Sequence, residues 1–186
     1  MLTSFLHHPF YRPFVLDVPD NWACRQIYNL PLNELINVMD TALCQGHSMA
    51  WATDISEDGF SWSNGLALVP DKEVKGLGKK SKSAVGARYL NDEELFYTVQ
   101  EKEITPQMRQ WAFDTYETTD DHGMHIVGLA KDQVGNKFYY VKNSWGETNL
   151  YNGYLYASEA YVKYKTIAVL LNVQAIPVEI RRRLGI

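Results

Sequence analysis

The residues best suited to chemistry in this sequence are His122 and Asn143, which belong to two apolar, β-prone stretches, 121–129 and 138–146. A polar link with a Gly-Asn pair, 131–137, joins them, so an antiparallel β-hairpin is the simplest interpretation. That hairpin brings His122 close to Asn143. A histidine works as a general base when a second group fixes its ring, and an asparagine side-chain oxygen can accept a ring N–H. The sequence therefore predicts a His122–Asn143 pair.

Two neighbours of this pair also matter. Trp145 follows Asn143 by two residues, so we expect it to cover the pair from water, which strengthens a hydrogen bond, and to be a substrate-binding residue. His125 lies three residues after His122, and strand alternation puts the two histidines on opposite faces. Spacing alone leaves both histidines as candidates for the base.

The stretch 121–128, Asp-His-Gly-Met-His-Ile-Val-Gly, and the stretch 142–146, Lys-Asn-Ser-Trp-Gly, resemble the histidine and asparagine motifs of papain-like cysteine peptidases in order and approximate spacing. This resemblance implies that His122 is the catalytic base and that Asn143 orients it. His125 is then a packed or hydrogen-bonded strand residue.

Three further stretches, 2–10, 18–22 and 116–122, resemble the bleomycin hydrolase/aminopeptidase C branch of that family. The resemblance spans essentially the whole chain but only the C-terminal half of the family. It implies an α+β papain-like fold, mainly the antiparallel β-barrel-like domain that carries His and Asn, with flanking helices. The N-terminal, Cys-bearing helical domain of the family has no counterpart here.

The nucleophile of the family lies in a block of the form Gln…Cys-Gly-x-Cys-Trp. The chain has two cysteines, Cys24 and Cys44; neither is followed by Trp or closely preceded by Gln. Cys44 also falls in the last turn of a predicted helix, where the carbonyl end disfavours a thiolate. We therefore expect the chain alone to be inactive and its first partner to be the N-terminal half of the same enzyme.

The function that the resemblance implies is a cysteine aminopeptidase, which removes N-terminal residues from peptides by thiol acyl transfer without a metal or other cofactor. A homo-oligomer is also implied. In this branch the C-terminal carboxylate, here that of Ile186, holds the substrate ammonium in the cleft; the alternative is a frayed surface tail. Met49 and Trp51 match a strand that lines a specificity pocket, and the alternative is a core strand. The alternative function is a non-catalytic truncated, assembly or binding domain.

Composition sets wider bounds. With 186 residues, 46% of them hydrophobic and 22% charged, the chain suits a single domain over 1–186. A net charge of -4 argues against a nucleic-acid partner. The two cysteines lack metal-ligand spacing, and no apolar run approaches the roughly 18 residues of a membrane span. Two cysteines also give no disulfide framework, so we expect a reducing compartment and a cytoplasmic protein. The N-terminus lacks signal-peptide features, and any targeting segment would lie upstream of this chain.

Periodicity and capping residues predict helices at 31–45, 93–99 and 105–116, and a helix or turn at 158–164. The expected buried face of the third helix consists of Met108, Trp111, Ala112 and Tyr116. Apolar β-prone runs predict further strands at 48–53, 151–157 and 165–173. A long loop region is expected at 56–91 and a tail at 174–186. The loop holds a lysine-rich run at 75–82, interpreted as a solvated loop or as a site for nucleic acid or an acidic partner.

Overall fold

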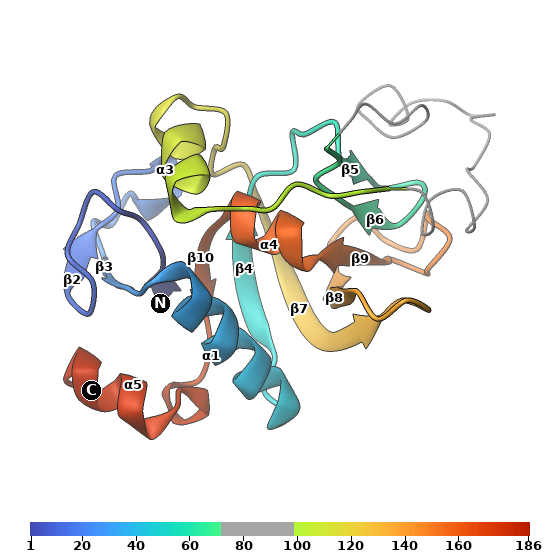
Figure 1. Ribbon diagram of the computed structural model, residues 1–186. Coiled ribbons are helices and arrows are strands. Elements are labelled where there is room, and N and C mark those ends of the chain that lie inside the picture. The colour runs from blue at the N-terminus through green and yellow to red at the C-terminus, as the bar shows by residue number, and fades with distance from the viewer. Residues whose placement is uncertain (72–98) are drawn as a thin grey trace.

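The computed structural model describes residues 1–71 and 99–186, and Figure 1 shows one twisted sheet with helices packed around it. The strands are β1 (Leu2–Thr3), β2 (Pro13–Val15), β3 (Gln26–Asn29), β4 (Met49–Thr53), β5 (Phe60–Ser61), β6 (Leu66–Ala67), β7 (His122–Lys131), β8 (Lys137–Lys142), β9 (Tyr154–Ser158) and β10 (Thr166–Leu170). The helices are α1 (Leu32–Cys44), α3 (Pro106–Asp114), α4 (Glu159–Lys165) and α5 (Val178–Leu184), with short 3-10 turns η1 (Pro19–Asn21) and η3 (Val173–Ala175).

The strand order is β2-β3-β1-β10-β4-β7-β8-β9-β6-β5. The pairs β1/β3 and β6/β9 are parallel, and the other pairs of the described sheet are antiparallel. Because β4 and β8 flank β7, the strand that begins with His122 lies in the middle of the sheet. The predicted α+β class is confirmed.

The predicted hairpin is formed by β7 and β8, whose register runs from His125 opposite Lys142 to Lys131 opposite Lys137. The Asp132 carboxylate accepts the backbone N–H groups of Val134 and Asn136, which closes the turn. The polar link therefore supplies its own turn chemistry, as Asp commonly does.

Helix α1 covers one face of the sheet beside β10 and β4 (Figure 1). Its buried residues are Leu32, Leu35, Ile36, Val38, Met39 and Ala42. This three-and-four spacing is the one that predicted the helix, because it places the apolar side chains on a single stripe. The stripe packs into a core that includes Trp51 of β4, Ile126 of β7 and Val141 of β8.

Helix α3 corrects one prediction. Thr105 caps its first turn as expected, with its side chain accepting from Met108 N. The buried face, however, consists of Arg109, Gln110 and Ala112, whereas Trp111 and Tyr116 are exposed. Arg109 is drawn inward because it donates to the carbonyl oxygens of Ser4, Lys163 and Tyr164. These long-range acceptors leave no periodic signal in the sequence.

The expected loop region and tail are also more ordered than predicted. Residues 56–71 contain β5 and β6, and β6 is a strand because it pairs with β9, far along the chain. The tail forms η3 and α5. The lysine-rich run and most of the expected helix at 93–99 lie outside the described residues. Among the described helices, none combines the length and apolarity that a bilayer crossing requires.

Candidate active site

His122 and Asn143 are in contact: Nε2 of His122 lies 2.8 Å from Oδ1 of Asn143. His122 is the first residue of β7, and Asn143 follows directly after β8. Both are held in the sheet, because His122 is the register partner of Thr53 and Asn143 N donates to Gly153 O. The proximity expected from the hairpin is therefore confirmed.

The same contact fixes the ring tautomer of His122. Oδ1 of Asn143 also accepts the backbone N–H of Ser144 at 2.7 Å, so this atom is an acceptor and the amide orientation is set. His122 must then donate, which places the ring proton on Nε2. Its other ring nitrogen, Nδ1, is left as a proton acceptor, as a general base requires.

Trp145 covers this pair together with aromatic residues that the sequence did not single out. Its ring centroid lies 5.1 Å from that of His122, and it makes edge-on contacts with Phe60 and Trp62 at 6.0 and 5.4 Å. Trp62 is fixed in turn by a hydrogen bond to Thr148 Oγ1. Trp145 keeps 37% of its surface exposed, so it shields the ring on one side and presents an aromatic surface on the other.

The loop after Asn143 depends on Gly153. Its φ is +91°, and a Cβ at this position would lie 2.7 Å from Gly146 O. Asn149 supports the same turn by accepting Gly153 N and donating to Tyr154 O. The loop therefore returns to β9 at a fixed place, which keeps the backbone of Asn143 in register.

A pocket of about 220 Å³ lies on the face of the sheet that carries Ala52, opposite the core face of Trp51. Ala52 and Ala168, which are register partners, form part of its floor, and Ala52 also pairs with Gly123, the residue after His122. Leu16, Val18 and Ile27 contribute apolar walls, and Asp120 and Trp22 are among the other lining residues.

Asp120 is the unusual group in this pocket. Burial, followed by the neighbouring carboxylates of Asp20 and Asp121, raises the pKa of Asp120 to about 6. Its Oδ1 is enclosed and has no hydrogen-bond partner. A carboxyl group with one enclosed, unpartnered oxygen therefore belongs to the lining of this pocket, two residues before His122.

The other predicted site residues lie elsewhere. Met49 and Trp51 are each 1% exposed in the core, and Trp51 Nε1 donates to Thr166 Oγ1, so they have no surface to offer a substrate. This corrects their assignment as substrate-binding residues. Strand alternation turns both side chains toward α1, and the residue of β4 that lines the pocket is Ala52. His125 contacts Ser48 Oγ at 2.8 Å and has no contact with Asn143.

Ile186 is also displaced from its expected place. Helix α5 buries Ile180 and Leu184 in the core, and Arg183 binds Glu34 and lies over the Tyr11 ring. These contacts place the C-terminal helix beside the start of α1 (Figure 1), so the described tail does not bring its carboxylate to His122.

Neither cysteine contributes to the pair. Cys24 and Cys44 are free and exposed; Cys24 follows η1, and Cys44 is the last residue of α1. No contact of either with His122 is found. Among residues 1–71 and 99–186, no group of three or more His, Cys, Asp or Glu side chains is arranged to hold a metal ion.

Comparison with known proteins agrees with these observations. A sequence profile of the Peptidase C1-like family matches residues 77–185, more than half of the chain. The structure resembles that of PepW from Lactobacillus rhamnosis HN001, with a TM-score of 0.65 and 19% identity, over 97% of this chain and 36% of that one. A weaker likeness, with a TM-score of 0.37 and 18% identity, links 75% of this chain to 30% of the ragweed pollen cysteine protease Amb a 11 in its proform. No curated protein sequence matches the chain.

The likeness to PepW concerns the fold, and the chain spans about a third of the length of that protein. The fold is α+β and papain-like, and the profile match covers both the histidine and the asparagine motifs. The resemblance seen in those motifs is thus confirmed, and the chain belongs to the Peptidase C1-like family.

Proposed function

We propose that the chain provides the general base and its orienting residue to a cysteine aminopeptidase of the bleomycin hydrolase type. The observation that carries this proposal is the hydrogen bond from Nε2–H of His122 to Oδ1 of Asn143. It leaves Nδ1 of His122 free to take a proton from a thiol. Family membership supports a peptidase, and the stretches 2–10 and 18–22 support the branch.

In the proposed reaction, Nδ1 of His122 takes the thiol proton, and the thiolate forms a bond to the carbonyl carbon of the substrate. His122 then gives this proton to the leaving amine as the C–N bond breaks, which leaves a thioester. Water attacks the thioester while His122 accepts its proton, and the proton returns to the thiolate as the acid leaves. Asn143 keeps the ring oriented throughout, and Trp145 limits access of water to the pair.

The thiol in this proposal comes from a part of the enzyme outside this sequence. Cys44 terminates a helix, where the carbonyl ends disfavour a thiolate, and Cys24 lies in an exposed loop. The chain spans 36% of PepW, which leaves room in an enzyme of this family for a Cys-bearing portion.

Asp120 is the group that we propose to hold the free amino group of the peptide. Asp120 lines the pocket next to Ala52 and lies two residues before His122, and an ammonium is a natural partner for a carboxylate. The packing of α5 takes Ile186 away from this place, so Asp120 replaces the C-terminal carboxylate in the proposal. A cytoplasmic location and a homo-oligomeric complete enzyme remain parts of the proposal that rest on the sequence.

The test measures hydrolysis of an aminoacyl fluorogenic substrate by the chain alone and by the chain assembled with a Cys-bearing portion of a family peptidase. We expect turnover that a thiol-directed inhibitor blocks only in the assembled enzyme. His122→Ala should abolish it. His125→Ala, the matched control on the same strand, should keep most of it.

Three results would contradict parts of this proposal. Turnover by the chain alone, blocked by a reagent on Cys24 or Cys44, would show that the nucleophile is internal. Retention of activity in His122→Ala with loss in His125→Ala would mean that the other histidine is the base. An assembled enzyme without activity would favour the alternative, a non-catalytic assembly or binding domain.

A further inference from the structure

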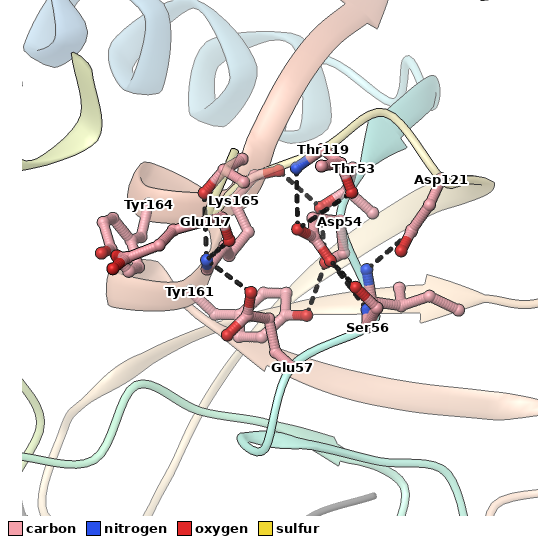
Figure 2. A network of polar contacts seen from close by, with 12 residues as sticks. Thr53, Asp54, Ser56, Glu57, Glu117, Thr119, Asp121, Tyr161, Tyr164 and Lys165 are labelled. Atoms are coloured by element: carbon pink, nitrogen blue, oxygen red, sulfur yellow. Dashed lines mark hydrogen bonds and ion pairs between the residues drawn. The ribbon is translucent and has the colours of Figure 1, made fainter. Parts of the chain in front are cut away.

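The segment 117–121 leads into His122 without regular secondary structure, yet it is held by a dense polar network (Figure 2). We propose that Asp54 and Lys165 are positioning residues, which hold this segment so that the ring of His122 stays on Asn143. The inference rests on the proposed function in taking His122 as the base, but the contacts that support it do not depend on that role.

Lys165 holds the start of the segment. Its ammonium group donates to Glu117 O at 2.8 Å and Thr118 Oγ1 at 3.0 Å, and it pairs with Glu57 at 2.6 Å. The side chain is only 3% exposed. A buried ammonium needs all its donors satisfied, so this site fixes the places of Glu117 and Thr118 closely.

Asp54 holds the middle of the segment. One carboxylate oxygen accepts Thr119 N at 2.8 Å, and the other accepts Ser56 N and Ser56 Oγ at 2.7 and 3.0 Å. Asp54 is almost fully buried, and Tyr161 of α4 donates to its backbone carbonyl at 2.7 Å. A buried carboxylate with backbone N–H donors on both oxygens is a rigid connection.

Asp121, at the end of the segment, makes a hydrogen bond back to the residue after Asp54. Asp121 Oδ1 accepts Ile55 N at 2.9 Å, so segments 54–56 and 119–121 exchange hydrogen bonds in both directions, as Figure 2 shows. Lys165 also contacts β4, because its backbone carbonyl oxygen accepts a hydrogen bond from Thr53 Oγ1 at 2.9 Å. Thr53 is the register partner of His122. The backbone before His122 and the strand residue opposite it are thus tied to Asp54 and Lys165.

The place of His122 in its strand explains why restraint of residues 117–121 affects the orientation of its ring. His122 is the first residue of β7, and strand ends open more readily than strand centres. Its ring makes one hydrogen bond to Asn143, which a small shift of the strand end would break. A network that restrains residues 117–121 therefore acts on the orientation of the ring.

The test compares Asp54→Ala with Asp40→Ala in the 186-residue chain. Asp40 is a matched control: its carboxylate accepts from Lys137 and Tyr139 and ties α1 to β8, and none of these partners belongs to 117–121. Exchange of the His122 Nε2 proton with water is measured by NMR, with assignment through His122→Gln, and global stability is measured by urea unfolding. Both substitutions lower global stability, so stability alone does not separate them.

We expect Asp54→Ala to speed exchange of the ring proton by about tenfold or more beyond what global unfolding explains, because it frees Thr119 N. Asp54→Asn keeps one acceptor oxygen, which can serve Thr119 N, but it turns an NH2 donor towards Ser56 N, so it should restore only part of the protection. Asp40→Ala should leave the rate unchanged. If Asp54→Ala does not fold, Thr118→Val removes one acceptor of Lys165 and should speed exchange by about threefold.

An unchanged exchange rate in Asp54→Ala, or in Thr118→Val where that variant replaces it, would overturn the proposal. So would equal acceleration in Asp40→Ala, which would show a general loss of stability. Failure of the proposed function is a separate result, because an enzyme in which His122 has no role in turnover would still show these exchange rates.

Discussion

Asn143 accepts the ring proton of His122 at 2.8 Å with the same side-chain oxygen that accepts the N–H of Ser144. The backbone N–H of Ser144, directly after β8, therefore fixes the orientation of the Asn143 amide. The amide oxygen in turn fixes the orientation and tautomer of the His122 ring. The tautomer of His122 is therefore decided by the place where β8 ends.

Replacing Asn143 in the assembled enzyme tests this relationship. Asn143→Ala should lower kcat/KM on the order of a hundredfold, since the ring loses its only described orienting partner. Asn143→Asp keeps an acceptor for the Nε2 proton, so it should retain more of the activity than Asn143→Ala. An Asn143→Ala enzyme with the rate of the parent would contradict an orienting role.

Gly153 tests how the loop holds Asn143 in register. Gly153→Ala places a Cβ 2.7 Å from Gly146 O in a backbone with φ of +91°, so both strain and a clash arise. Gly135→Ala is the control, because φ there is +96° with no atom near the added Cβ. The control should lose about 1–2 kcal/mol of unfolding free energy from the left-handed backbone alone.

Urea unfolding should show a further loss of about 1–3 kcal/mol in Gly153→Ala over that control, from overpacking. Equal losses in the two variants would mean that the loop relaxes away from Gly146 without cost.

The raised pKa of Asp120 predicts how the stability of the chain changes with pH. Its pKa is raised from 3.8 to about 6 in the folded chain, so between these values the folded state binds more protons than the unfolded state. Stability then falls as pH rises from about 4 to about 6, because the slope follows the difference in bound protons. The carboxyl is partly exposed, so solvent screening reduces the size of the effect.

Asp120→Asn should remove this fall, which leaves the variant more stable than the parent at pH 7 and similar at pH 3. Urea unfolding across this range measures the difference, with Asp17→Asn at an exposed position as the control. A parent chain whose stability does not depend on Asp120 between pH 4 and 6 would mean that the carboxyl is better solvated than its pocket suggests.

Local sequence patterns were enough to predict several of the helices and strands. Helix α1 follows from apolar residues at helical spacing, and the β7–β8 hairpin follows from two β-prone runs around a polar turn. The same patterns failed for α3, where Arg109 is buried and Trp111 is exposed. There, carbonyl groups from distant segments decide which side faces inward.

The sequence by itself determined the hairpin, the His122–Asn143 pair and the family, because a register and two motifs are local properties. Only the tertiary structure decided what surrounds the pair. Asp54 meets Thr119 across 65 residues, and Lys165 meets Thr118 across 47. Such contacts arise from the packing of β4, α4 and the segment before β7, and the spacing of residues along the chain carries no trace of them.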